Sequence, residues 1–214
     1  MFAGHAGAAA AAKRFLPEVN LGWLLIAALG ADILLWVLAL AGIERIVVPV
    51  DPSVRRYLTF VFPYSHSLLA TFLYAILAGL LAFRLRGRAA ALVFAILVFS
   101  HFVLDALVHI PDLTLAGADT LRFGTSLENT PIEALALESV LTLAGLALYW
   151  PRCRNGIVGV ILLTLLLTIA GTLWAPPPDD PQLAAVGPLA SDILVIGLCA
   201  WFDRSRPDSA ELLR

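Results

Sequence analysis

The sequence predicts an all-α fold, a polytopic membrane helix bundle of six to seven hydrophobic helices. Its composition is the first reason: the chain of 214 residues is 60% hydrophobic and only 14% charged, whereas a soluble domain carries about a quarter charged residues. Its mean hydropathy is +0.90. Apolar stretches of about 20 residues, long enough to cross the hydrocarbon core of a bilayer, account for the excess. We therefore expect an integral membrane protein.

Seven helical segments are predicted from these apolar stretches. In chain order they cover residues 2–14, 20–43, 66–86, 89–110, 131–150, 155–175 and 184–202. Proline or glycine separates the neighbouring segments, because proline disrupts a helix interior and glycine is a poor helix former. The separators, again in order, are Pro17, Pro49, Gly87, Pro111, Pro131, Pro151 and the proline-rich run 175–181.

The first segment, residues 2–14, is rich in alanine and differs from the others in length. At about 1.5 Å per residue it extends roughly 20 Å, which is too short to cross a bilayer easily. The bundle would then contain either seven spans or six spans and a re-entrant first helix.

The basic residues predict how the bundle is oriented. Ten of the fourteen lie at one end of the predicted helices: Lys13, Arg14, Arg84, Arg86, Arg88, Arg152, Arg154, Arg204, Arg206 and Arg214. The positive-inside rule makes this end cytoplasmic, together with the C-terminus. The connections at the opposite end are longer and more acidic, and they would face outward.

Five side chains that bind metals lie inside the hydrophobic segments: His5, Asp32, His66, His101 and Asp105. An ionisable group in hydrocarbon costs several kcal/mol, so each one is a functional-site hypothesis. Counted from the inner helix ends at about 1.5 Å per residue, all five fall between the middle of the membrane and its outer surface. We expect them to meet around one metal site.

The spacing and type of these residues indicate which metals they would bind. His101 and Asp105 are four residues apart and share a helix face, which His109 continues as a sixth candidate ligand. Imidazoles and carboxylates without thiolates suit zinc, manganese or iron, in a site that keeps an open position for water. We expect one or two divalent ions, with zinc the first choice. The alternatives are hydrogen bonds between packed helices and a proton relay.

Three further residues are candidates for supporting roles. Glu138, inside the segment 131–150, is a candidate catalytic residue, acting as general base or holding a metal ligand in place. Arg55 and Arg56 precede His66 at the outer end and are candidate substrate ligands that would clamp a phosphate. Contact with lipid headgroups is the alternative for both arginines.

The sequence around these residues resembles a known family. Gly4-His5, Gly30-Ala-Asp32, Ser65-His66-Ser-Leu-Leu-Ala70 and Ser100-His101-Phe-Val-Leu-Asp105 are similar to motifs of the YdjM-like family of bacterial inner-membrane, metal-dependent hydrolases. The resemblance covers residues 1–112 approximately. It implies that the five residues are metal ligands and that the chain is a multi-pass protein of a bacterial inner membrane, with its site toward the periplasm.

The order His…Asp…His…His-x-x-x-Asp is also similar to zinc-dependent phospholipases C and P1-type nucleases, which are helical enzymes with a trinuclear zinc cluster. That resemblance implies that Asp32, His66, His101 and Asp105 share one ion. Asp105, here also a candidate catalytic residue, would bridge to a second ion held by His5. The chain departs from the pattern because no histidine follows His109. One or two ions are therefore expected instead of three.

We interpret residues 1–214 as a single integral membrane domain, with a metal-site half at about 1–112 and a helical remainder at 131–202. The expected function is metal-dependent hydrolysis of a phosphoester in a lipid or lipid-linked substrate. A metal-ion or proton transporter that uses the same residues is the alternative, and a non-catalytic scaffold is a third reading. Membrane lipids are the other expected partners, no nucleic acid is expected, and the oligomeric state is left open.

Overall fold

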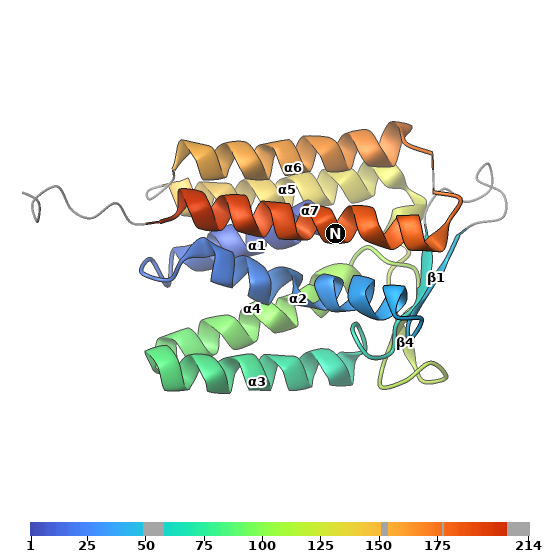
Figure 1. Cartoon of the computed structure of the whole chain (residues 1–214), viewed down its shortest axis with the longest axis horizontal. Coiled ribbons are helices and arrows are strands. Elements are labelled where there is room, and N and C mark those ends of the chain that lie inside the picture. Colours follow the sequence, from blue (N-terminus) through green and yellow to red (C-terminus); the bar gives the residue numbers. More distant parts are fainter. Residues whose placement is uncertain (49–57, 151–153, 177, 205–214) are drawn as a thin grey trace, which may run out of the picture.

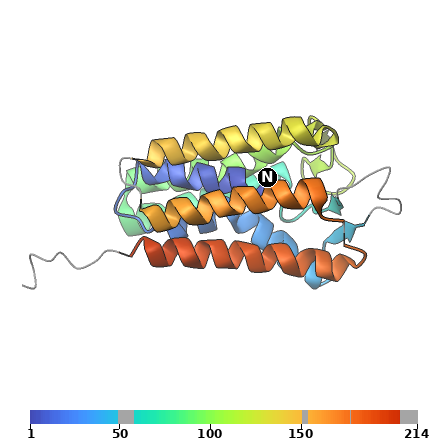
Figure 2. The same cartoon turned by 90° about the horizontal axis from the view of Figure 1, so that it is seen from above.

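The computed structural model describes residues 1–48, 58–150, 154–176 and 178–204. In this part of the chain, seven α-helices form a bundle with two small antiparallel hairpins at one end (Figure 1, Figure 2). Six of the helices are long and apolar enough to cross a membrane. The predicted fold class, an all-α membrane bundle, is confirmed.

The described helices are α1 (Phe2–Lys13), α2 (Leu21–Leu40), α3 (Leu68–Arg86), α4 (Arg88–Ala106), α5 (Pro131–Tyr149), α6 (Asn155–Trp174) and α7 (Pro181–Phe202). Strand β1 (Arg45–Val47) pairs with β2 (Thr59–Val61), and β3 (Leu113–Thr114) pairs with β4 (Arg122–Phe123). A 3₁₀ turn, η1 (Leu127–Asn129), precedes α5. The strands lie at the end of the bundle opposite the turn between α3 and α4 (Figure 1).

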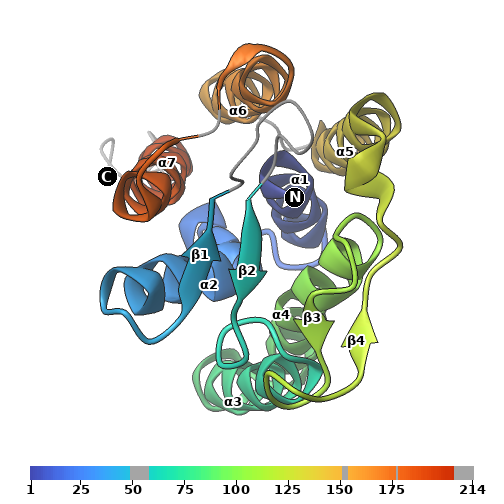
Figure 3. The ribbon, with the colours of Figure 1, turned by 90° about the vertical axis from the view of Figure 1, so that its right-hand side faces the viewer.

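Helix α1 lies inside the bundle, surrounded by longer helices (Figure 3). It packs against α2, α4, α5 and α6, and nine of its twelve residues are buried. Because it has only 12 residues, it extends about 18 Å and is not among the six candidate spans. The first segment is therefore a short internal helix, whose N-terminal end reaches the middle of the bundle (Figure 1).

Small side chains allow α1 to occupy this central position. Ala3, Ala6, Ala9 and Ala10 are completely buried. At Gly7 the backbones of α1 and α5 touch: a Cβ atom there would lie 2.6 Å from Thr142 Cα, and one on Gly145 would overlap the Gly7 carbonyl. Close contact between helix backbones through small residues is typical of membrane bundles. The alanine and glycine content of α1 thus determines how deep in the protein its side chains lie.

The inner end of α1 is fixed by one carboxylate. Lys13 Nζ donates to Asp203 Oδ2 at 2.6 Å and to the carbonyl of Val19 at 2.6 Å. The same Asp203 oxygen accepts a hydrogen bond from the backbone nitrogen of Leu21 at 2.6 Å. These contacts join the end of α1, the start of α2 and the end of α7.

Several predicted helix ends were wrong by two to four residues, and two of these errors affect the site. The predicted helix 66–86 begins at Leu68, because Ser67 is its N-cap and accepts a hydrogen bond from the backbone nitrogen of Ala70. His66 therefore lies in the turn that precedes α3, and it does not open the helix. The predicted helix 89–110 ends at Ala106.

His109 consequently does not continue the face of α4. The residue before a proline disfavours helical geometry, so Pro111 prevents the helix from extending to Ile110. The chain turns instead, and the connection folds back so that the backbone nitrogen of Ser126 donates to the carbonyl of His109 at 2.8 Å. His109 lies in this turn. At the other end of the chain, α7 begins at Pro181, three residues before the predicted start, because Asp180 caps it.

The contact between α1 and α5 predicts the effect of a single methyl group. Gly145→Ala would force α1 and α5 apart, and we expect it to lower stability by about 1–3 kcal/mol, as overpacking does. Thermal unfolding in detergent micelles measures the change. Gly197→Ala in α7 is the matched control, because a Cβ atom there meets nothing within 4 Å. Equal stability of the Gly145→Ala variant and the wild-type protein would contradict the close packing described here.

Candidate metal centre

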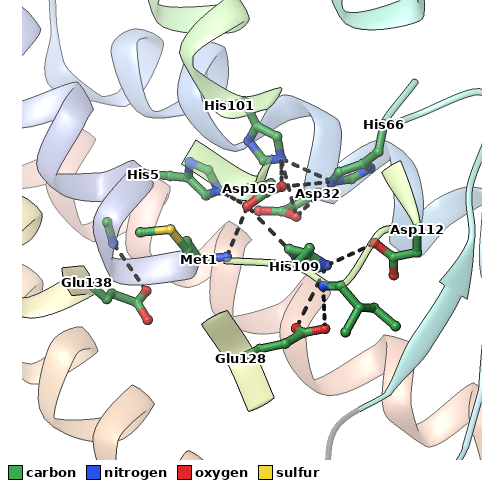
Figure 4. Close-up of polar contacts among 12 residues, drawn as sticks. Met1, His5, Asp32, His66, His101, Asp105, His109, Asp112, Glu128 and Glu138 are labelled. Carbon is green, nitrogen blue, oxygen red and sulfur yellow. Dashed lines mark hydrogen bonds and ion pairs between the residues drawn. The ribbon is translucent and has the colours of Figure 1, made fainter. Parts of the chain in front are cut away.

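Five ionisable side chains from four parts of the chain meet near the middle of the bundle (Figure 4). His5 comes from α1, Asp32 from α2, His66 from the turn before α3, and His101 and Asp105 from α4. We call these five residues the His/Asp cluster. All are buried except Asp32, whose side chain is 16% exposed. Residues that are up to 100 positions apart in sequence thus form one site.

Asp32, His66 and His101 surround a common point, and Asp105 lies beside the two histidines. His66 Nε2 lies 3.1 Å from His101 Nε2 and 3.4 Å from Asp32 Oδ1. Asp105 Oδ2 lies 3.1 Å from His101 Nε2 and 3.6 Å from His66 Nε2. Ligand atoms around a tetrahedral zinc ion, each about 2.0–2.1 Å from the metal, are about 3.3 Å apart. These side chains could therefore hold a metal ion.

The hydrogen bonds of the two imidazoles determine where their lone pairs point. His101 Nδ1 lies 2.7 Å from the carbonyl of Ala28, which can only accept, so Nδ1 carries the hydrogen. Ser65 Oγ donates to Glu44 Oε2 at 2.7 Å and is left to accept from His66 Nδ1 at 2.8 Å. In the neutral rings both Nε2 atoms are then lone-pair donors. Two such nitrogens 3.1 Å apart, beside two carboxylates, require a positive charge between them.

Asp105 joins this group to a second one. Its Oδ1 atom lies 3.0 Å from His5 Nε2 and 3.3 Å from the Met1 amine. The imidazole ring of His5 stacks on that of His101, with ring centres 3.9 Å apart. His5, His101 and Asp105 form a second set of three donors that could hold an ion. The two oxygens of Asp105 thus face two different groups of donors.

The sequence analysis missed Glu44, which orients His66. Glu44 is buried, and its Oε1 accepts hydrogen bonds from the backbone nitrogens of Tyr64 and Ser65. Through the Ser65 hydroxyl it fixes the ring orientation of His66. Such outer partners of metal ligands tune ligand basicity and metal affinity. Glu44 lies 22 positions before His66, and no helical or strand spacing links the two residues. The only clue in the sequence was Ser65, the hydroxyl residue next to the histidine.

Glu138 holds α1 in place. Its Oε1 accepts hydrogen bonds from the backbone nitrogens of Ala3 at 2.8 Å and Gly4 at 3.2 Å. The carboxylate therefore satisfies the free N–H groups at the start of α1, one and two residues before His5. This contact positions a cluster residue, and a role as general base stays a prediction.

His109 lies at the edge of the cluster and faces outward from it. Its Nε2 is 4.0 Å from Asp105 Oδ1, while its Nδ1 is directed toward Asp112 and Glu128 (Figure 4). Burial by itself lowers the pKa of His109, but contact with Asp112 and the charge of Asp105 raise it above the ordinary value. Burial also raises the pKa of Glu128. These groups form an acidic pocket beside the cluster.

A cavity of about 610 Å³ opens onto one side of the cluster. Asp32, His66 and His109 form its polar end, and its remaining walls are mostly apolar side chains of α6 and α7. His5, His101 and Asp105 do not line it, so they lie behind the residues that a ligand would meet. Asp192 of α7, also in the wall, is buried. The predicted substrate ligands Arg55 and Arg56 lie outside the described residues.

On the side of the cluster toward Lys13 the bundle contains a packed apolar core. Leu21, Leu24 and Leu25 of α2 are completely buried, as are Ile157 and Ile161 of α6. This core extends from the cluster toward the end that carries Lys13. A second cavity of about 700 Å³ lies between α2, α3 and α4, and none of the five cluster residues lines it.

No protein-family model, curated protein or solved structure matches this chain. The resemblance to the YdjM-like family and to zinc-dependent phospholipases C therefore stays a prediction that rests on the motifs quoted above.

The contact between Glu44 and Ser65 predicts a change of tautomer. In Glu44→Gln the new amide can donate to Ser65 Oγ, so the hydroxyl can donate to His66 Nδ1 and leave a hydrogen on Nε2. We expect a 10–100-fold loss of zinc affinity, the size of effect that outer partners have. Competition with a chromophoric chelator measures it. In a Ser65→Ala background the same substitution should have no further effect, and an equal loss in both backgrounds would rule out the hydroxyl relay.

Proposed function

We propose that this protein is a membrane-embedded, metal-dependent hydrolase that cleaves a phosphoester in a lipid or lipid-linked substrate. One observation supports metal dependence above the others. Two imidazole nitrogens, both oriented as lone-pair donors, lie 3.1 Å apart with a carboxylate on either side. The donor set of nitrogen and oxygen atoms, without sulfur, favours a site with an open coordination position.

The residues of the cluster have different tasks in this proposal. His66 and His101 hold a divalent cation together with Asp32 and Asp105, and zinc fits this donor set and its spacing. Asp105, with one oxygen toward each group of donors, would share a second ion with His5. A bound divalent cation supplies a water nucleophile at neutral pH and polarises the phosphoryl oxygens. Asp32, at the edge of the cavity, would accept a hydrogen bond from the attacking water.

The cavity supports a substrate with a long apolar chain. Its polar end is the cluster, and the walls beyond it are mostly apolar side chains of α6 and α7, such as Leu163, Leu167 and Leu194. Thr164, Thr168, Ser191 and Asp192 also lie in these walls. No lysine or arginine is among the described residues that line it. The cavity thus pairs one polar reaction end with an apolar channel between two candidate spans, the arrangement that a lipid entering from the bilayer requires.

The packed core on the inner side favours an enzyme over the alternative, a metal-ion or proton transporter. A transporter needs a polar path from one side of the membrane to the other. Here buried leucine, isoleucine and alanine side chains fill the region between the cluster and the inner end.

We also propose a location in a bacterial inner membrane, with the cluster toward the periplasm. The ends of α1, α3 and α7 that carry Lys13, Arg86 and Arg204 lie together at one end of the bundle (Figure 1). By the positive-inside rule this end, and the C-terminus with it, would be cytoplasmic. The cavity and the hairpins would then belong to the outer half.

Metal removal tests the reaction class. The purified protein in detergent should hydrolyse either p-nitrophenyl phosphate or bis(p-nitrophenyl) phosphate, which distinguishes a monoesterase from a diesterase. Activity should disappear with a chelator and return with zinc. The activity of His101→Ala should fall at least about 100-fold, which is more than the loss caused by removing a residue that only hydrogen-bonds a metal ligand. The variant Glu133→Gln, at an exposed position, should retain full activity.

Two outcomes would oppose this function. Stoichiometric bound zinc without hydrolysis of these esters, or of phosphatidic acid and phosphatidylglycerol in vesicles, would reject the hydrolase. Zinc uptake into proteoliposomes would then establish the transporter.

The cavity predicts a dependence on chain length. Leu167→Trp would fill part of the channel, so hydrolysis of a long-chain phosphoester should fall several-fold while a short-chain analogue is unaffected. Leu166→Trp is the matched control, because Leu166 is equally exposed on α6 but does not line the cavity. Comparison of kcat/KM for the two substrates in all three proteins measures the effect, and equal losses on both substrates would argue against chain binding there.

A further inference from the structure

The connection between α4 and α5 contains a second group of ionisable side chains. His109 Nδ1 lies 3.5 Å from Asp112 Oδ1 and 4.0 Å from Glu128 Oε2. All three residues lie outside the six candidate spans, at the hairpin end of the bundle. His109 lies between Asp112 and Glu128, which approach it from the two sides of the connection (Figure 4).

Of these side chains, Asp112 has the most buried polar atoms without a hydrogen bond. Its side chain is 6% exposed, and neither carboxylate oxygen has a hydrogen-bond partner. His109 Nδ1, which faces it, has no hydrogen-bond partner either. A buried carboxylate without partners costs several kcal/mol, so a compensating positive charge is expected beside it.

The backbone around these side chains is firmly connected. Glu128 Oε1 accepts a hydrogen bond from the nitrogen of Ile110 at 2.9 Å, which leaves Oε2 toward His109. The nitrogen of Glu128 donates to the carbonyl of Val108 at 2.9 Å. Gly124 has φ +149, and a Cβ atom there would overlap the carbonyls of His109 and Ile110. The backbone that carries the three side chains is therefore fixed on both sides of the connection.

We propose that His109 Nδ1, Asp112 and Glu128 Oε2 form a binding site for a divalent cation that is separate from the His/Asp cluster. One imidazole and two carboxylates suit a cation of the Mn²⁺ or Zn²⁺ class, with water at the remaining positions. His109 Nδ1 lies 3.5 Å from Asp112 Oδ1 and 4.0 Å from Glu128 Oε2, and the two carboxylates would rotate toward each other to share an ion with it. His109 then belongs to this loop site, and its other nitrogen faces Asp105 of the cluster.

An ion in the loop site would act on the cavity through His109. The imidazole lines the cavity and would be fixed by its Nδ1–cation bond. The same ion would connect the turn after α4 to η1, because its ligands come from both. The loop site would thus shape the entrance to the cluster without being part of it.

Metal binding by the full chain tests this proposal. The protein is stripped with a chelator in detergent and titrated with Mn²⁺, with binding followed by electron paramagnetic resonance. The Asp112→Asn, Glu128→Gln double variant should bind one ion fewer than wild type, and the exposed Asp119→Asn should bind as many as wild type. A His66→Ala, His101→Ala variant, which impairs the cluster, should still bind the loop ion with coupling to a single imidazole nitrogen.

The measurement on the His66→Ala, His101→Ala variant does not depend on whether the Asp112→Asn, Glu128→Gln variant folds. Absence of any bound Mn²⁺ in the His66→Ala, His101→Ala variant would overturn the proposal. So would an unchanged number of ions in a folded Asp112→Asn, Glu128→Gln variant, since His109 would then be a protonated partner of the two carboxylates. Either result leaves the proposed hydrolase intact, because that function depends on the cluster alone.

Discussion

Two imidazole lone pairs and two carboxylates directed at one buried point constrain the rest of this structure. Such an arrangement is unfavourable without a positive charge among these groups. Both imidazoles are oriented by a specific hydrogen bond. The Ala28 carbonyl fixes the ring orientation of His101, and the Glu44–Ser65 pair fixes that of His66. Polar contacts thus orient both imidazoles toward the carboxylates, as a site that could hold a metal ion requires.

The position of α1 follows from the same constraint. His5 reaches Asp105 only because a short helix of alanine and glycine fits between the longer ones. Bulkier residues would move its backbone outward and carry the imidazole with it. Glu138 satisfies the free end of the helix and Lys13 fixes the other end. The two halves of the chain are joined in this way, since α5 and α7 in the second half hold a helix of the first.

The cluster is asymmetric, and this asymmetry bears on function. Asp32 and His66 face a cavity, while His5, His101 and Asp105 lie behind them. The inner side is packed with leucine and isoleucine. A ligand would therefore meet the site from one direction, along apolar walls of α6 and α7. The outer connection adds His109, Asp112 and Glu128 near the same entrance, so two ionic centres would act on one opening.

The sequence by itself determined the membrane-bundle class, most helix bounds and the identity of the five cluster residues, because hydrophobic run length and intramembrane charge are local properties of a chain. Pro111 and Ser67 shifted two helix ends, and their effects depended on capping and chain reversal that apolar periodicity does not encode. Only the tertiary structure decided that Glu44 orients His66, that Glu138 holds α1, and that His109 turns toward Asp112. These contacts join residues from separate elements, and their geometry exists only once the helices have packed.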